Sequence, residues 1–276
     1  MRTLITLAGK EVRDGLRNRW VFSAILLLCA LSLALSLLGS APGGAVKASP
    51  LGVTVASLAS LGVYLIPLIA LMLSYNAFVG EMERGTMLLL LTYPVARWQV
   101  VLGKFLGHWS ILAISILGGY GIAGLVIAAL GGTDGAEGWQ AYFMMMASSA
   151  LLGAIFVALG YLLSVLASEE RMAAGLAVGL WIVMVVIYDL ALIGTLVADT
   201  TGMVSETLFS VLLLANPTDA YRIFNLTAIE GVAKAAGMVG IGIKLGLGSS
   251  LALLIMAAWT VLPLAATVAV FGRREV

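Results

Sequence analysis

Residues 81–104 read EMERGTMLLLLTYPVARWQVVLGK. This stretch connects an apolar run at 58–79 to another that begins near Val100, and each run is long enough to cross a bilayer. Because charged side chains return at its start and again at its end, we predict that the stretch is a hinge just outside the membrane, between two spans.

The hinge contains an apolar ridge that is too short to cross a bilayer. Met87–Leu91 give only about two helical turns, and Pro94 cannot continue a helix in the ordinary way. The stretch therefore predicts a short helix, a break at Thr92–Pro94 and a new helix that carries Arg97 and Lys104 at the membrane interface. An apolar helix held outside the bilayer favours a groove on a soluble partner. The alternative is a helix that lies flat among the lipid headgroups.

The composition is that of a membrane protein. The 276 residues are 62% hydrophobic and 11% charged, and the mean hydropathy is +1.10, whereas a soluble domain carries about 25% charged residues. With 15 basic and 14 acidic residues, the net charge of +1 gives no footprint for nucleic acid. We expect an all-α polytopic membrane protein that contacts lipid and binds no nucleic acid.

The residues that carry most enzymatic chemistry are scarce. Cys29 and His108 are the only residues of their types, so a disulfide framework, a zinc cluster and a histidine-based triad are not expected. Neither Gly9-Lys10 nor Gly103-Lys104 is followed by Ser or Thr, as a phosphate-binding loop requires. Met144–Met146 point about 100° apart on a helix and are expected to fill a core. We predict no catalytic residue, no metal site and no cofactor bound by this chain.

The apolar runs predict six membrane spans in a single domain, 1–276. The spans cover residues 20–38, 58–79, 100–130, 139–167, 172–197 and 251–271. Residues 1–19, with spaced basic side chains, predict an amphipathic helix on the membrane surface. The first apolar run, of about 19 residues, exceeds a cleavable signal core, and cleavage near Ala48 is the alternative.

The segment 198–250 is the only long stretch without a clean span. It predicts a short helix after Ser205 that stops at Asn216-Pro217, and a second short helix beginning there. A competing topology makes 231–250 a seventh span, which would bury a lysine in the membrane.

The basic residues orient the six spans. Eleven of the 15 fall on the side of the hinge and of both ends of the chain, and four fall on the other side. The first group is Arg2, Lys10, Arg13, Arg17, Arg19, Arg84, Arg97, Lys104, Arg171, Arg273 and Arg274, and the second is Lys47, Arg222, Lys234 and Lys244. The positive-inside rule therefore predicts a cytoplasmic hinge and cytoplasmic termini.

Two features inside the predicted spans invite interpretation. Gly103 with Gly107, and a further series at Gly118, Gly121 and Gly124, predict close approach of a neighbouring helix. Asp189 lies about two thirds of the way along its span. It either lines a polar cavity, as a candidate for a translocation path, or marks where the helix leaves the lipid.

The hinge carries a mixed motif of charged residues, glycine and proline. It consists of Glu81-x-Glu83-Arg84-Gly85-Thr86, a leucine run, Tyr93-Pro94-Val95-x-Arg97 and Gly103-Lys104. This motif resembles the cytoplasmic loop of ABC-2 type permeases, the six-span membrane subunits of ATP-driven exporters with separate ATPase subunits. More narrowly, 61–108 and the run Asn216-Pro217-Thr218-Asp219-Ala220-Tyr221-Arg222 are similar to the permeases that serve nitrous oxide reductase maturation. Asn76 departs from that pattern, which often has an acid there.

The resemblance implies partners and contact residues. It implies a homodimer in the bacterial inner membrane, two cytoplasmic ATPase subunits that hold ATP and Mg, and a periplasmic copper-handling accessory protein. A coupling helix from Glu81 to Leu91 would contact the ATPase through Glu81, Glu83, Arg84, Gly85, Thr86, Leu88, Leu91 and Pro94. The accessory protein would meet Asn216, Pro217, Asp219, Tyr221 and Arg222. The alternative for this second group is a helix break that packs against lipid headgroups.

The cargo does not follow from the residues. The resemblance suggests a sulfur-containing or copper-related species, or ATP-driven motion passed to the accessory protein without cargo. The rival functions are a generic exporter of a drug, lipid or peptide and an ion-coupled carrier that needs no ATPase.

Overall fold

A computed structural model describes residues 2–17, 19–39, 50–129, 135–198, 205–227 and 249–274. In this part of the chain all regular structure is helical, so the prediction of an all-α membrane protein is confirmed for it. The proposed cleavage near Ala48 and most of the proposed seventh span at 231–250 lie outside the described residues.

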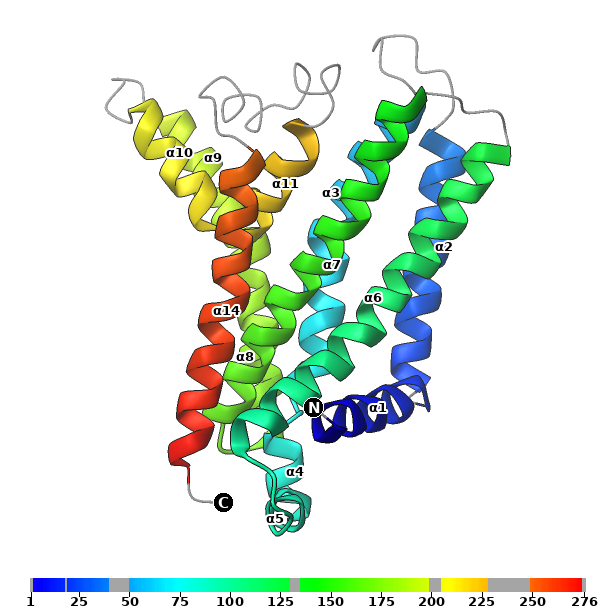
Figure 1. Cartoon of the computed structure of the whole chain (residues 1–276). Coiled ribbons are helices and arrows are strands. Elements are labelled where there is room, and N and C mark those ends of the chain that lie inside the picture. Colours follow the sequence, from blue (N-terminus) through cyan, green and yellow to red (C-terminus); the bar gives the residue numbers. More distant parts are fainter. Residues whose placement is uncertain are drawn as a thin grey trace.

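Long helices form a bundle, and short helices lie at its two ends (Figure 1). The long helices are α2 (Arg19–Gly39), α3 (Pro50–Ser74), α6 (Arg97–Ala129), α7 (Gly135–Leu166) and α14 (Ser249–Arg273). A further rod consists of α8 (Glu170–Trp181), the π-helical turn η1 (Ile182–Ile187) and α9 (Tyr188–Ala198). The short helices are α1 (Arg2–Arg17), α4 (Val79–Glu83), α5 (Thr86–Leu91), α10 (Glu206–Ala215) and α11 (Pro217–Thr227).

Five stretches of the described chain are long and apolar enough to cross a membrane. They are Thr54–Glu83, Arg97–Ala129, Gly135–Leu166, Glu170–Ala198 and Ser249–Arg273. Within α2 the apolar stretch found among described residues is the shorter Leu26–Leu35, so the sixth span stays a prediction.

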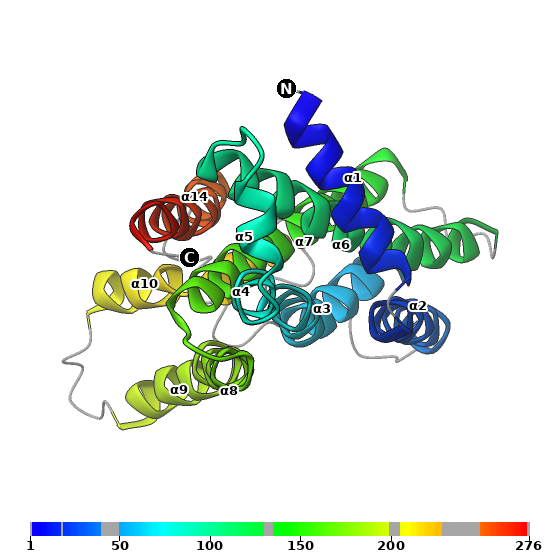
Figure 2. The ribbon, with the colours of Figure 1, turned by 90° about the horizontal axis from the view of Figure 1, so that it is seen from below.

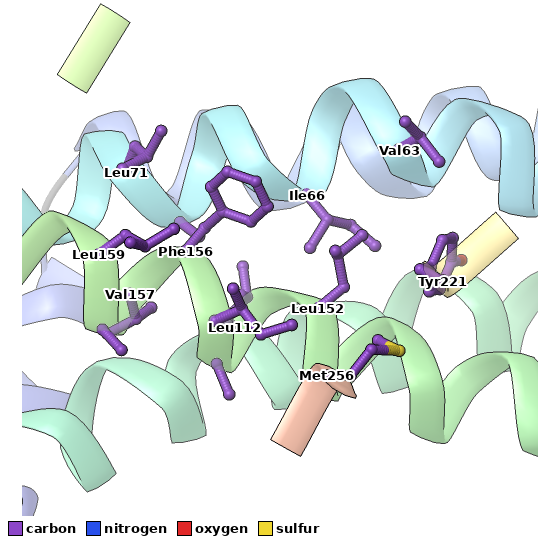
Figure 3. Packing of buried hydrophobic residues seen from close by; sticks show 14 of the residues in the cluster. Val63, Ile66, Leu71, Leu112, Leu152, Phe156, Val157, Leu159, Tyr221 and Met256 are labelled. Atoms are coloured by element: carbon purple, nitrogen blue, oxygen red, sulfur yellow. The ribbon is translucent and has the colours of Figure 1, made fainter. Parts of the chain in front are cut away.

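The core forms around α7, which packs against α3, α14 and α6. Figure 3 shows Ile66 of α3 and Leu112 of α6 meeting Leu152 and Phe156 of α7, with Met256 of α14 beside them. All five are buried. By contrast, the α8–α9 rod is the least buried of the five candidate spans and lies at the edge of the bundle (Figure 2).

The two ends of the bundle differ in content. At one end, which we call the hinge end, α4 and α5 lie near α1 and the C-terminal end of α14 (Figure 1). Seen from below, α1 crosses the bundle, and it packs on α6 (Figure 2). At the other end, the far end, α11 is packed among α14, α7 and α3.

Candidate functional site

The hinge consists of two short helices. They are joined by a turn in which one residue adopts the left-handed backbone conformation. α4 ends at Glu83, Gly85 has a φ of 69°, and α5 begins at Thr86. The Thr86 hydroxyl donates to the Glu81 carbonyl at 3.2 Å, which closes the turn. The prediction of one helix from Glu81 to Leu91 was therefore wrong, because glycine accepts a positive φ at little cost and lets the chain turn there.

The apolar ridge of α5 is divided between an anchor and an exposed face. Met87 is fully buried. Leu88 and Leu89 are 56% and 65% exposed, and Tyr93, just after the helix, is 68% exposed. α5 ends at Leu91 and the next helix begins at Arg97. An exposed apolar surface therefore protrudes from the hinge end of the bundle.

The eight expected ATPase contacts differ in exposure. Leu91 is half-buried. Six others are exposed, namely Glu83, Arg84, Gly85, Thr86, Leu88 and Pro94. Glu81 differs because its carboxylate accepts hydrogen bonds from Lys104 at 2.8 Å and from Lys10 at 3.3 Å. Glu83 also has an internal partner, since its Oε1 accepts from the Glu170 backbone N–H at 2.8 Å at the start of α8. Glu81 therefore has internal partners, as expected for a carboxylate in an apolar setting, and its contact with an ATPase stays a prediction.

A buried charge network lies behind the hinge. Lys104 is 2% exposed and donates to Glu11 Oε1 at 2.9 Å as well as to Glu81. The other Glu11 oxygen lies 3.4 Å from His108 Nε2, and His108 Nδ1 is 2.7 Å from the Tyr161 hydroxyl. We call Glu11, Glu81, Lys104, His108 and Tyr161 the hinge network. It connects α1, α4, α6 and α7.

Electrostatics keep Glu11 ionised in this network. Burial would by itself raise the pKa of the Glu11 carboxyl, but Lys104, His108 and Lys10 outweigh burial and lower that pKa below its ordinary value. The lysines pair with two carboxylates, so the charges are balanced. The sequence pattern predicted Lys104 at the membrane interface and gave no indication of its partner Glu11. The available signal was a lysine among apolar residues of α6, which requires a buried anion.

Glycines bring α1 directly onto α6. A Cβ at Gly103 would lie 2.7 Å from Leu7 Cβ, and one at Gly107 would lie 2.5 Å from Glu11 Cβ. The predicted close approach of a helix is confirmed here, and the helix is α1. The prediction was wrong for Gly118 and Gly121, where an added Cβ would meet nothing within 4 Å.

The base of the hinge is fixed to the core on its other side. Ser164 Oγ of α7 accepts from the Phe78 and Val79 backbone N–H groups at 3.0 and 3.1 Å, which satisfies the start of α4. The Phe78 ring packs against the rings of Tyr161 and Phe271, with centroids 5.1 and 5.2 Å away. A force applied to α4 would therefore reach α7 and α14.

Two shallow hollows flank the hinge. One is lined by Lys10, Glu81, Arg84, Thr86, Leu89, Leu90 and Tyr93. The other is lined by Tyr75, Glu83, Glu169, Glu170, Arg171 and Ala174. Asn76, where the resemblance led us to expect an acid, donates to Glu170 Oε1 at 3.5 Å beside the second hollow. The hinge end thus combines an apolar ridge with charged hollows that a soluble partner can engage.

At the far end, the residues expected to contact the accessory protein lie largely buried within the helical bundle. Asn216, Asp219 and Tyr221 are no more than 2% exposed, Pro217 is buried and Arg222 is half-buried. Pro217 starts α11, and this helix packs among α3, α7 and α14. The expectation of an exposed docking surface at these residues was therefore wrong.

Asp189 is paired rather than isolated. Arg222 Nη1 donates to Asp189 Oδ2 at 2.5 Å and to Asp219 Oδ1 at 3.2 Å. The predicted fifth span is also interrupted by the π-helical turn η1 just before Asp189. Asp189 therefore forms a salt bridge to α11, and its place on a translocation path stays a prediction.

Comparison with known proteins identifies the family. Residues 5–276 match the family described as ABC-2 family transporter protein. A relative from Stutzerimonas stutzeri, named "Probable ABC transporter permease protein NosY", is 44% identical over 277 residues, which are 99% of each chain. The chain belongs to the ABC-2 transporter family. A Pseudomonas aeruginosa relative of the same name is 46% identical to this ABC-2 permease across 100% of both chains.

Membership of the ABC-2 family indicates that the chain works with separate ATPase subunits. ABC-2 permeases are membrane subunits whose ATPase lies on partner proteins, and a chain without a catalytic role of its own fits that family. This ABC-2 permease is accordingly a multi-pass membrane subunit that pairs with ATPase subunits.

Proposed function

We propose that this ABC-2 permease serves copper-site maturation of nitrous oxide reductase. It does so either by moving a sulfur-containing or copper-related species or by passing ATP-driven motion to a periplasmic accessory protein. The observation that carries the proposal is identity of 44% and 46%, over essentially the whole chain, with two relatives named NosY. The motif at 61–108, which resembles permeases of that maturation system, supports it.

The hinge is the proposed coupling element. Leu88 and Leu89 of α5 enter a groove on each ATPase subunit, and the exposed Glu83, Arg84 and Thr86 border that contact. ATP and Mg are held by the two ATPase subunits, and two copies of the permease form the membrane part. The hinge network then transfers ATPase movement to α1 and α6, because buried ion pairs resist separation.

The proposed orientation places the hinge end in the cytoplasm of a bacterium, with the chain in the inner membrane. Of the 15 basic residues, eleven belong to the side of the hinge under the six-span topology, which supports this orientation. The accessory protein then meets the far end from the periplasm.

The double change Leu88→Ser with Leu89→Ser tests the coupling element. We expect loss of an ATP-hydrolysing partner when the permease is purified from native membranes, with the permease still inserted, because both side chains are exposed and not part of the core. Leu125→Ser is the control, since Leu125 is 72% exposed but lies on α6 away from the hinge. Unchanged ATPase recovery in the double variant would exclude α5 as the docking element.

The maturation role needs a separate test. In a bacterium that makes nitrous oxide reductase, deletion of the permease should yield enzyme that lacks copper, and wild-type permease but not the Leu88→Ser, Leu89→Ser variant should restore it. Fully copper-loaded enzyme in the deletion strain would favour a generic exporter. Uptake into vesicles by purified permease alone, driven by an ion gradient, would favour an ion-coupled carrier.

A further inference from the structure

The contact between α9 and α11 at the far end contains an unusual excess of negative charge. Asp189 and Asp219 both accept from the single guanidinium of Arg222. The side chain of Asp219 is only 3% exposed and that of Asp189 is 14% exposed. Two ionised carboxylates and one cation would leave one uncompensated charge in a buried site, which is strongly unfavourable.

The same contact leaves two buried oxygens without partners. Among the described residues, Asp189 Oδ1 and Asp219 Oδ2 are buried and have no hydrogen-bond donor. These are the oxygens that Arg222 does not use. The two carboxyl groups lie side by side, because both contact the same nitrogen, Arg222 Nη1, at 2.5 and 3.2 Å. A carboxylate pair of this kind becomes satisfied when one member carries a proton and donates to the other.

We propose that Asp189 and Asp219 form a proton-binding site in which one proton is shared between Asp189 Oδ1 and Asp219 Oδ2 and Arg222 pairs with the remaining charge. One proton removes the surplus charge and satisfies both orphaned oxygens at once. A metal ion is a poorer occupant, because two carboxyl groups that already share one arginine offer few free ligands, and within the described residues no group of three or more acidic, histidine or cysteine side chains could hold a metal ion.

The surroundings support a neutral-range proton affinity. Burial, together with the nearby Asp189 carboxylate, raises the pKa of Asp219 from its ordinary 3.8 to about 7. Among the described residues, two phenols lie near the pair: Tyr188 of α9, and Tyr64 of α3, whose hydroxyl is 3.5 Å from Arg222 Nη2. α11 also packs on α7 and α14. The charged residue of α7 is Glu137, in its first turn, and that of α14 is Arg273, in its last turn.

Two hydrogen bonds connect the segments around the Asp189–Asp219 site to the α8–α9 rod, which is the least buried candidate span. Asn216, which precedes α11, donates to the Met184 carbonyl in η1 at 2.6 Å, and the Tyr188 hydroxyl donates to the Leu212 carbonyl at 2.6 Å. A π-helical turn frees a carbonyl of the regular ladder and shifts the side chains that follow it. Loss of the proton would place two like charges across the α9–α11 contact and weaken it.

Infrared difference spectroscopy on the purified full-length permease with its partners tests the site. Lowering the pH through about 7 should produce one protonated-carboxyl band in the wild type. The band should disappear in Asp219→Asn and disappear or move in Asp189→Asn, and it should persist in Glu137→Gln, whose carboxylate is exposed on α7. Both asparagine variants keep an amide that can donate to the other carboxylate, so the contact is retained and folding can be checked by thermal unfolding.

Arg222→Gln gives an independent readout. Because the guanidinium lowers the proton affinity of the pair, its removal should raise the midpoint of the band by about one pH unit or more. Absence of the band in the wild type, or its survival in both Asp219→Asn and Asp189→Asn, would overturn the proposal. An unchanged midpoint in a folded Arg222→Gln protein would overturn it as well.

Discussion

At the scale of single residues, the permease depends on a few buried charges whose partners come from distant parts of the chain. Lys104 is enclosed by Glu11, 93 positions away, and by Glu81, 23 positions away. A buried ion pair stabilises little compared with apolar packing, but the loss of one partner leaves an uncompensated charge. The importance of Lys104 therefore lies in holding three segments in one arrangement.

Lys104→Met should destabilise the permease severely. The change leaves Glu11 and Glu81 without their buried cation, and we expect a loss of about 3–5 kcal/mol in the free energy of unfolding in detergent micelles. Lys10→Met is the matched control: Lys10 touches the same carboxylates but its side chain is 52% exposed, so the loss should stay below about 1 kcal/mol. Similar losses in the two variants would mean that the network does not distinguish buried from exposed pairing.

Asp219 should make stability depend on pH with a defined sign. Its pKa is about 7 in the folded chain and ordinarily 3.8, so between these values the folded state holds a proton that the unfolded state releases. Stability from this group is therefore greatest at low pH and falls as the pH rises through about 7. Melting temperatures recorded between about pH 5 and about pH 8 should decline less in Asp219→Asn than in the wild type. Glu137→Gln, at an exposed site, should follow the wild type.

At the scale of elements, the contact between α1 and α6 is unusually close because glycine occupies two successive turns of α6. Gly103 faces Leu7 and Gly107 faces Glu11. The same pair of turns carries Lys104 and His108, so the close approach also brings Glu11 within reach of its partners. Packing and charge pairing thus reinforce each other along one helix pair.

Alanine at Gly103 and Gly107 should separate α1 from α6. Each added methyl group would overlap an α1 side-chain atom at 2.5–2.7 Å, and we expect the double variant to lose about 1–3 kcal/mol of unfolding free energy. The control is Gly118→Ala with Gly121→Ala on the same helix, where the added carbons meet open space. There the better helix propensity of alanine should leave stability unchanged or raise it by about 0.5–1 kcal/mol per site. Equal effects of the two double variants, measured by thermal unfolding, would contradict the packing argument.

Across the whole molecule, the bundle separates the proposed coupling element from the proposed proton-binding site. The α4–α5 hinge and α1 lie at one end, and the α9–α11 contact lies at the other (Figure 1). α7 is the common support, because it packs on α3 and α14 and is the most buried candidate span. Events at the hinge can therefore reach the far end through a rigid core rather than through flexible connections.

Labelling from the two sides of the membrane should locate these ends. In a Cys29→Ser background, Leu89→Cys on the exposed face of α5 should react only with a reagent on the cytoplasmic side. Glu137→Cys, in the first turn of α7 and exposed, should react only from the periplasm. Reaction of both cysteines from one side would disprove the proposed topology, and a reversed pattern would place the hinge outside the cell.

The class of the protein and the position of its hinge followed from the order of the amino acids alone. Hydropathy is a local property, so runs of apolar residues identify helices that the lipid requires to be internally hydrogen-bonded. The interruption at 81–104 was visible for the same reason, and the motif within it was sufficient to indicate the family.

Which polar residues are partners and which are exposed became clear only from the folded chain. Glu81 and the Asn216–Arg222 run read as surface because both are polar and adjoin helix breaks, yet the fold buries most of them against α6, α7 and α9. Their partners, Lys104 and Asp189, lie far away in the sequence, and an electrostatic contact depends on distance in space. For that reason the hinge network and the proton-binding pair could not be derived from spacing along the chain.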